Sequence, residues 1–317
     1  VYKGEQWIRR KRLPKKPASA HAGLLPSGFS AEHLGPNDYY YWDDFWGVAG
    51  LKAAGFLARA YGDKKRADQF NREAREFYQC IEQSLKQARA RLKQAAMPAS
   101  PYRRMDAGAI GSLVAGYPLR LCPAKDTRIM RTADFLIQNS FVHGGFFQDM
   151  THSGINPYLT LHIAQVLLRA GDPRYFDLMT AVARLASSTG QWPEAVHPRT
   201  GGGCMGDGQH VWAAAEWTMM IRNCFIREEE DEGRLVLCSG IPRRWLEKGK
   251  RLSFGPAPTS FGEVAVSVCS DDGKITVEWE AKWFADEPVI DIHLPEFPEV
   301  TAQQGQSLVQ IGRDGMT

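Results

Sequence analysis

The sequence predicts a mainly α protein, a ring of helical hairpins followed by a small antiparallel β domain. Three observations predict it. Apolar and amphipathic helical segments alternate along the chain, the long and chemically rich connections lie on one side of them, and the composition becomes strand-like near the C-terminal end. The helical segments are expected at residues 43–61, 64–95, 105–116, 126–139, 155–170, 173–188 and 207–225.

Composition excludes some classes of protein. The 317 residues are 44% hydrophobic and 24% charged, as in soluble globular proteins, and the net charge of +3 does not favour a nucleic-acid partner. No apolar run is long enough for a transmembrane helix, so no membrane partner is expected. The six cysteines lack paired spacing, which indicates reduced thiols and a cytoplasmic location, with a secreted or periplasmic one left open.

The first part of the chain, residues 1–42, is expected to be an irregular arm and rim loop. It is rich in proline, glycine and aromatic residues and shows little periodicity. Its basic run from Arg9 to Lys16 is typical of a solvated arm.

The helices of residues 43–227 divide into two kinds. Segment 43–61 is apolar almost all round and should be buried, whereas 64–95 carries one apolar stripe on a charged cylinder and should lie outside. Repeated alternation predicts an inner and an outer layer. All inner helices would then run parallel, with their N-termini on one rim; they are 43–61, 105–116, 155–170 and 207–225.

The connections into the inner helices form this rim. They are "NDYYYWDD", "SPYRRMD", "HGGFFQDMTHSGIN" and "GQWPEAVHPRTGGGCMGDGQH", whereas the reverse connections are short and plain. Long loops on a rigid scaffold commonly carry function, so we expect the functional site at this rim.

After the acidic run "EEEDEG" the pattern changes to strands. "EVAVSVC" and "KITVEWEAKW" alternate apolar and polar residues around a turn at "DDG", which predicts an antiparallel hairpin. Residues 228–317 are therefore expected to form a small β domain, with the segment after residue 300 loosely attached.

Asp43 and Asp44 have two interpretations. An aspartate at the start of a helix can accept backbone N–H bonds, so one of the pair is expected to cap helix 43–61. Capping alone does not require Tyr41 and Trp42 before the pair or Trp46 after it. Aromatic rings beside carboxylates suit sugar binding, because the C–H faces of pyranose rings stack on them.

Glu194 is a further carboxylate, set between Trp192–Pro193 and His197 in the connection to the last helix. The glycine-dense segment beside it allows close approach of backbone to a ligand. Asp207 is expected to cap helix 207–225, and Glu216 to be a buried, hydrogen-bonded residue rather than a catalyst.

Two facing carboxylates suit glycoside hydrolysis. One protonates the leaving oxygen, and the other activates water or attacks the sugar. A glycoside, oligosaccharide or polysaccharide would be the substrate. No cofactor and no metal is expected, since Cys204 and His210 do not have the spacing of a standard zinc site.

The stretches "GLLPSG…YYYWDDFWGVAGL" and "GQWPEAVHPRTGGGCMGDGQHVWAAAEW", the alternating hairpins and the β tail resemble the six-hairpin glycosidases. These (α/α)6 toroids include glucoamylases, trehalases, processing α-glucosidases and α-L-rhamnosidases. The resemblance implies an inverting mechanism, with the acid before the sixth helix and the base before the twelfth. It favours Asp43 over Asp44 as the acid, and Glu194 in "WPE" resembles the rhamnosidase-type base.

The resemblance also implies that part of the ring is missing. A full toroid has twelve helices, whereas seven are predicted here, so the chain corresponds to the C-terminal portion. We expect an upstream N-terminal half, a partner chain or an oligomer to complete it.

The remaining candidate residues are those that would contact the sugar. The expected stacking residues are Tyr41, Trp42, Trp46 and Trp192, and the expected hydroxyl ligands are Arg103, Arg104, Asp106, Gln148, Asp149, His197, Asp207 and His210. Two alternatives stay open: a binding or degenerate module that lacks catalysis, and a polysaccharide lyase or sugar epimerase using "SPYRR" and His143.

Overall fold

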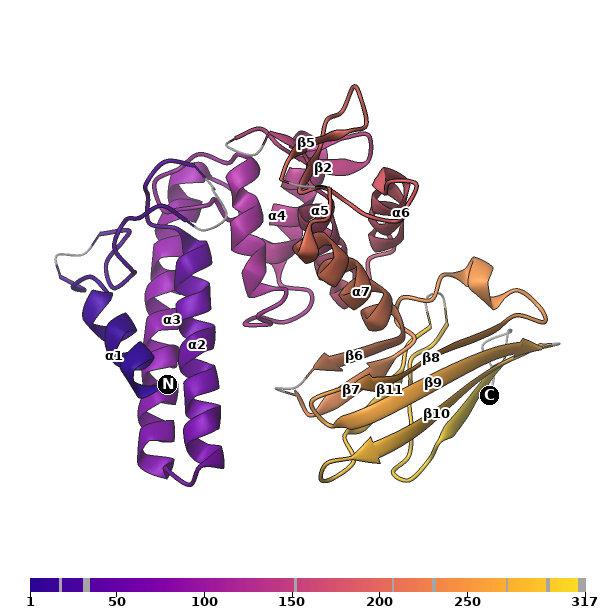
Figure 1. Ribbon diagram of the computed structural model, residues 1–317. Coiled ribbons are helices and arrows are strands. Elements are labelled where there is room, and N and C mark those ends of the chain that lie inside the picture. Colours follow the sequence, from indigo (N-terminus) through magenta and orange to yellow (C-terminus); the bar gives the residue numbers. More distant parts are fainter. Residues whose placement is uncertain are drawn as a thin grey trace.

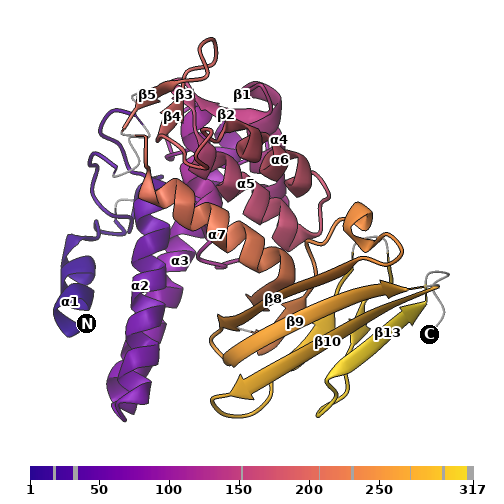
Figure 2. The same cartoon turned by 45° about the vertical axis from the view of Figure 1, so that its right-hand side comes forward.

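A computed structural model describes residues 1–16, 19–30, 35–150, 153–206, 208–229, 232–271, 273–294 and 297–312. The helices come first in the chain and the two larger sheets last, and Figures 1 and 2 show these sheets beside the C-terminal end of α7. The helices are α1 (Tyr2–Lys11), α2 (Tyr41–Ala60), α3 (Lys64–Leu92), the 3-10 helix η1 (Ala107–Ala115), α4 (Thr127–Asn139), α5 (Pro157–Ala170), α6 (Tyr175–Leu185) and α7 (Val211–Phe225).

The helices form two layers, as the alternation predicts. α2 packs against α3 and η1, η1 against α4 and α5, and α5 against α6 and α7. Every residue of α5 is buried, whereas α3 buries only the stripe that includes Phe70, Phe77 and Ile81. The inner row is therefore α2, η1, α5 and α7, with α3, α4 and α6 outside it.

Within the described residues, the inner row does not close into a ring. α2 and α7 lie at its two ends, and Figure 1 shows them on opposite sides of α4 and α5. The exposed side of α2 carries Trp46, Phe56 and Leu57, and that of α7 carries Val211 and Met219. The expectation that 43–61 is buried is therefore met on one side only, because Trp46, Phe56 and Leu57 are exposed. The inner helix α7 is likewise exposed on one side.

Two segments differ in kind from the sequence prediction, and the other helices differ from it at their ends by up to four residues. Residues 2–11 form α1, because its polar and apolar residues segregate on two faces, whereas an irregular arm was expected. Segment 105–116 is a 3-10 helix in which all nine residues are buried and Asp106 accepts from Gly108 N–H. Its glycines disfavour an α-helix, so packing must hold it. α5 begins at Pro157, a residue suited to the first helical turn.

The rim loops contain a sheet that the sequence did not indicate. Strands β1 (Phe141–Val142), β2 (Gly145–Gln148), β3 (Gly154–Ile155), β4 (Ala195–Val196) and β5 (Gly203–Met205) pair in that order. Ile155 faces Val196 in the ladder, which joins two loops that are forty residues apart in sequence. The long connections into α5 and α7 are thus held together.

The C-terminal strands form two four-stranded sheets rather than one wholly antiparallel unit. One has the order β13-β10-β9-β8, and the other β12-β11-β7-β6 with β7 and β11 parallel. The expectation of a loose segment after residue 300 is wrong for residues 308–312, because β13 pairs with β10 and buries two side chains. The strands are β6 (Ile226–Glu229), β7 (Arg234–Leu237), β8 (Arg251–Pro258), β9 (Gly262–Asp271), β10 (Lys274–Trp283), β11 (Val289–Ile292), β12 (Val300–Thr301) and β13 (Leu308–Gly312), with the 3-10 helix η3 (Arg243–Leu246) before β8.

Alternate burial fixes the β9–β10 hairpin in register. The inward residues of β9 and β10 include Val266, Val268 and Val277, and Val268 faces Val277 across the ladder. A register shift by one residue would expose this apolar set. No helix of the described residues is long and apolar enough to cross a membrane.

Candidate active site

Asp43 and Asp44 both lie in the first turn of α2, but neither caps it. Tyr40 occupies the N-cap position, and no side chain closes a capping bond there. Asp44 is 1% exposed, and its Oδ1 accepts from the Leu25 N–H at 2.8 Å, so it anchors the preceding loop to the helix. The expected cap is therefore wrong, because the helix begins two residues before Asp43.

The two carboxyls differ in environment. Burial raises the pKa of Asp44 to about 8, although the Leu25 hydrogen bond opposes this shift. Asp43 is half-buried, and burial raises its pKa to about 6. Among the described residues, no group hydrogen-bonds the Asp43 carboxyl, so desolvation alone accounts for its shift. Asp43 is thus the more accessible of two carboxyls that resist ionisation.

The aromatic residues around the pair point in different directions. Trp46 is 43% exposed, and its ring centroid lies 6.0 Å from that of the mostly buried Trp42. Tyr41 is fully buried, and its hydroxyl pairs with Ser84 Oγ of α3 at 2.8 Å. The expectation for Tyr41 is corrected, because it packs between the helical layers and leaves Trp46 as the exposed ring.

Glu194 is half-buried in a loop that is held from both sides. Trp192 donates its indole N–H to the Val182 carbonyl at 2.8 Å, and its ring lies 5.3 Å from that of Trp217. Ala195, next to Glu194, pairs with Met205 in the rim sheet. Trp192 is buried, so its expected role as a stacking surface is corrected to one of anchoring this loop.

Gly206 lies directly against Glu194. Its φ of +66° suits glycine, and a Cβ there would meet the Glu194 Cβ at 2.8 Å and Oε2 at 3.0 Å. The glycine-dense segment therefore fits closely around this carboxylate. The sequence led us to expect a close approach to a ligand, whereas the observed close approach is to Glu194 itself.

Arg103 and Asp106 form an ion pair with each other instead of facing a ligand site. Arg103 Nη2 lies 2.7 Å from Asp106 Oδ2, and Asp106 Oδ1 accepts from Gly108 N–H at 3.0 Å. Asp106 is thus the N-cap of η1, and Arg103 is held beside it. Arg104 is exposed and remains accessible to a ligand.

The other predicted hydroxyl ligands divide into accessible and structural residues. Gln148 is 1% exposed, and its Oε1 accepts from Asn156 Nδ2 at 3.3 Å, so it supports the start of α5. Asp149 is exposed. His197 closes a turn, since its Nδ1 accepts from the N–H groups of Arg199 and Thr200.

The start of α7 corrects one further expectation. His210, not Asp207, is the N-cap residue, and its N–H donates to the Trp192 carbonyl at 2.8 Å. Asp207 itself lies outside the described residues. His143 lines a cavity with α6 residues on the outer layer, whereas Tyr102 contacts His21 and Tyr39. Among the described residues, the histidine beside Tyr102 is thus His21 rather than the expected His143.

The pKa of Glu216 is raised, which the sequence did not indicate. It is half-buried rather than buried as expected, and it accepts a hydrogen bond from the Tyr117 hydroxyl at 3.3 Å. Burial raises its pKa to about 7, and the side chains of Trp212 and Tyr117 oppose the shift. A glutamate inside an otherwise apolar helix is the only sequence signal of this site.

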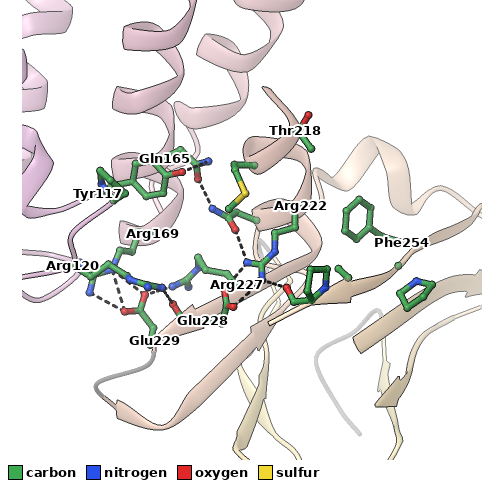
Figure 3. A pocket seen from close by; sticks show the side chains of 17 residues that line it. Tyr117, Arg120, Gln165, Arg169, Thr218, Arg222, Arg227, Glu228, Glu229 and Phe254 are labelled. Carbon is green, nitrogen blue, oxygen red and sulfur yellow. Dashed lines mark hydrogen bonds and ion pairs between the residues drawn. The ribbon is translucent and has the colours of Figure 1, made fainter. Parts of the chain in front are cut away.

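Two large cavities lie toward the C-terminal ends of the inner helices, near the C-terminal sheets. One of about 700 Å³ is lined by Tyr117, Gln165 and the arginine–glutamate pairs of α5, α7 and β6 (Figure 3). The other, of about 830 Å³, is lined by α2 residues, Leu119–Pro123 and Phe261.

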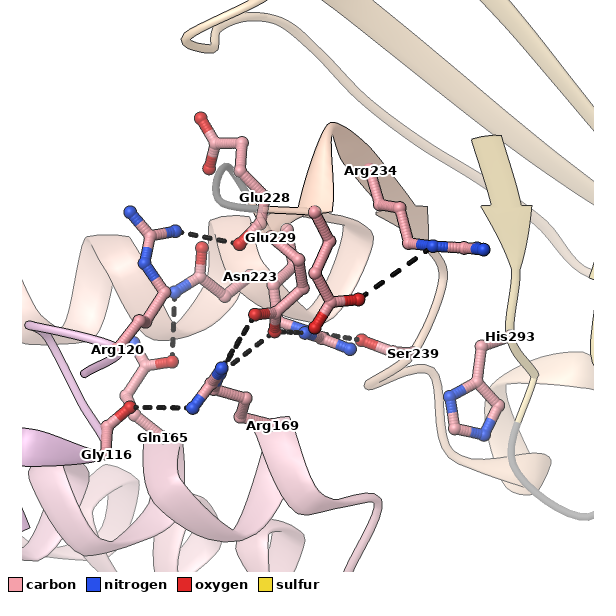
Figure 4. A network of polar contacts seen from close by, with 12 residues as sticks. Gly116, Arg120, Gln165, Arg169, Asn223, Glu228, Glu229, Arg234, Ser239 and His293 are labelled. Atoms are coloured by element: carbon pink, nitrogen blue, oxygen red, sulfur yellow. Dashed lines mark hydrogen bonds and ion pairs between the residues drawn. The ribbon is translucent and has the colours of Figure 1, made fainter. Parts of the chain in front are cut away.

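The charged residues of the first cavity make structural pairs (Figure 4). Arg169 binds both oxygens of Glu229, and Arg222 Nη2 lies 2.8 Å from Glu228 Oε1. Buried charges require such partners. These pairs join α5 and α7 to β6, so the cavity is a junction between helices and sheets. Among the described residues, no group of three His, Cys, Asp or Glu could hold a metal.

Comparison with known proteins gives similarity of fold only. No protein-family model matches the sequence, and no curated protein matches it. A sialidase structure is similar with a TM-score of 0.52 at 13% identity, covering 88% of this chain and 27% of that chain. The GH78 family rhamnosidase of Bacillus sp. GL1 is similar with a TM-score of 0.45 at 15% identity, covering 92% and 30%.

A further glycosidase structure has a TM-score of 0.48 at 15% identity, covering 62% of this chain. The present chain spans 55% of its length, so it corresponds to only part of that glycosidase. The similar structures are thus glycosidases, at low identity and with partial coverage.

Proposed function

We propose that this chain is a glycoside hydrolase, or the C-terminal catalytic portion of one, that uses two carboxylates in an inverting mechanism. Asp43 is the proposed general acid and Glu194 the proposed general base. The observation that carries the proposal is the half-buried Asp43 carboxyl, which burial keeps protonated to about pH 6 at the rim of the inner row. No cofactor is required.

Asp43 suits the acid because it can hold a proton and still reach a substrate. A general acid works best with a pKa near the working pH, and desolvation provides this for Asp43. Asp44 holds its proton to a higher pH, but it is fully buried and bound to the Leu25 backbone. Exposure therefore separates a catalytic role for Asp43 from a structural role for Asp44.

Glu194 suits the base because its loop is rigid. The Trp192 indole bond and the β4–β5 ladder hold the residues on both sides of it, so its carboxylate has a defined position. Fixed geometry is what general-base activation of water requires. Trp46, Arg104 and Asp149 are the accessible candidates for contact with the sugar.

The open inner row supports a further part of the proposal, which is that another element completes the ring. Exposed apolar stripes on α2 and α7 face outward at both ends of the row. An upstream segment, a partner chain or a second copy would bury them. The substrate would then lie in a cavity that this chain forms in part.

The test uses substrates with good and poor leaving groups. Asp43→Asn should lower the turnover of disaccharides strongly but that of 4-nitrophenyl glycosides much less, because nitrophenolate leaves without protonation. Glu194→Gln should slow both classes alike, because both need activated water. The thermal unfolding midpoint should stay close to that of the parent protein in both variants.

The stereochemistry and the geometry give separate checks. Proton NMR of the first product should show inversion, and the two carboxyls should lie roughly 6.5–9.5 Å apart. Equal losses on both substrate classes in Asp43→Asn, or full activity in Glu194→Gln, would contradict the assignment. Absence of hydrolysis together with retained sugar binding would favour the non-catalytic binding module, which the open row permits.

A further inference from the structure

Three aromatic rings meet where α7 begins. Trp212 is 37% exposed, and Tyr158 of α5 packs against it with ring centroids 4.7 Å apart and planes at 33°. The Tyr158 ring also contacts that of His210, at 4.9 Å. We call Tyr158, His210 and Trp212 the aromatic platform. Its buried member, Tyr158, fixes the position of the exposed indole.

Glu216 lies beside the indole of the platform. It lies one helical turn after Trp212 on the same face of α7, and the nearby Trp212 side chain lowers the pKa of its carboxyl, against the larger effect of burial. The Tyr117 hydroxyl also binds Glu216, at 3.3 Å. One side of the Trp212 ring packs on Tyr158, and the exposed part of the indole is available to a ligand.

The platform is joined to the loop of the proposed base. His210 N–H donates to the Trp192 carbonyl at 2.8 Å, and Trp192 precedes Glu194 by two residues. Trp192 is itself fixed by its bond to Val182. The aromatic surface and Glu194 are thus parts of one rigid unit at the rim.

We infer that the aromatic platform is a sugar-stacking subsite, in which the apolar C–H face of a pyranose ring lies on the Trp212 indole beside Glu194. The inference rests on the proposed function and assigns Glu216 as a positioning residue. A pyranose has an apolar face and hydroxyls at its edge, so it matches an exposed indole with a carboxyl group beside it. Aromatic side chains with a few placed polar groups are the usual lining of such sites.

A helix from a partner could cover this surface in place of a sugar, and a variant of Met219 distinguishes these two occupants. Met219 lies two turns further along α7 and is 38% exposed, close to the value for Trp212. A covering helix would contact both side chains. A sugar subsite needs Trp212 and does not need Met219, so Met219→Ala is a matched control.

The experiment measures sugar binding by the full chain with saturation-transfer difference NMR. The probes are methyl α-D-glucopyranoside, methyl α-L-rhamnopyranoside, methyl α-D-mannopyranoside and maltotriose. At least one should receive saturation on the C–H protons of a single ring face. Trp212→Ala should weaken its binding about tenfold, whereas Met219→Ala should leave it unchanged.

Glu216 variants test the positioning role. Glu216→Ala should weaken binding about as much as Trp212→Ala, because the indole loses the carboxyl beside it. Glu216→Gln keeps an acceptor oxygen and should restore binding to within about twofold of the parent protein. Circular dichroism and the unfolding midpoint show that each variant is folded.

Some outcomes would overturn the inference. No saturation of any probe by the parent chain, or equal weakening by Trp212→Ala and Met219→Ala, would show that the platform is not a sugar subsite. The proposed hydrolase would survive this result if Asp43 and Glu194 variants still lost turnover. Conversely, Trp212-dependent binding without hydrolysis would leave the subsite standing and refute the hydrolase.

Discussion

Asp44→Asn should make the protein more stable at neutral pH. Burial raises the pKa of Asp44 from 3.8 to about 8. In the unfolded chain the carboxyl ionises near pH 4, while in the folded chain it stays protonated to about pH 8. The folded state therefore binds one more proton in this window, and the free energy of unfolding falls as pH rises, by about 1.4 kcal/mol per pH unit.

The magnitude follows from the width of the window. Between pH 4 and pH 7 this single group removes about 4 kcal/mol of stability. Asparagine does not ionise, and its Oδ1 can still accept from Leu25 N–H. Asp44 Oδ2 has no hydrogen-bond partner among the described residues, so an amide nitrogen there replaces an equally unpaired hydroxyl. The variant and the parent should thus be nearly equal at pH 4.

Urea unfolding followed by circular dichroism, from pH 4 to pH 8, measures this difference. Asp43 and Glu216 titrate in both proteins, so subtraction of the two curves isolates Asp44. Parallel curves across the whole range would refute the reasoning, since Asp44 would then ionise equally in both states. Turnover should persist in Asp44→Asn, because the acid role is proposed for Asp43.

The remaining predictions concern the junction and the open row. Arg169→Ala removes one of the two arginines that pair with buried Glu229 and should lower the free energy of unfolding by about 3–5 kcal/mol. Arg174→Ala removes a half-exposed ion pair and should lower it by less than about 1 kcal/mol. Urea unfolding compares the two variants, and similar losses would contradict the argument that the buried pair contributes more. The double variant Phe56→Glu, Leu57→Lys should change the free energy of unfolding by less than about 0.5 kcal/mol, because both side chains are exposed. It should abolish association with a second copy or partner, which analytical ultracentrifugation measures. Unchanged association would show that this side of α2 is not the interface.

Helical periodicity predicted the order of the layers better than their details. The apolar character of α5 runs all round the helix, whereas α3 has a single stripe of one apolar side chain in three or four, and both segments pack as expected. α1 was missed because its basic residues dominate the composition of a short segment. The exposed side of α7 could not be predicted, since an apolar helix at the end of a row has the same sequence as one inside it.

The sequence predicted which loops carry the candidate site, but not which side chains contact one another there. Residues of four rim segments were identified, yet which aromatic ring faces solvent depends on where α2 begins. Tyr41 and Asp44 lie on the buried side, and Trp46 one turn later is exposed. The rim sheet was not foreseen, because strands of two to four residues in glycine-rich loops leave no periodic signal. Tyr158 and Trp212 come together only through tertiary packing.

The serial packing of α2, η1, α5 and α7 has a consequence for local unfolding. Each inner element is stabilised mainly by its neighbours in the row, as in repeat proteins, so the interior of the row should exchange its amide hydrogens most slowly. α7 continues directly into β6 and is tied to the sheets, whereas the α2–α3 hairpin forms the other end. The hairpin that carries Asp43 should therefore open first, and the loop of Glu194 should outlast it.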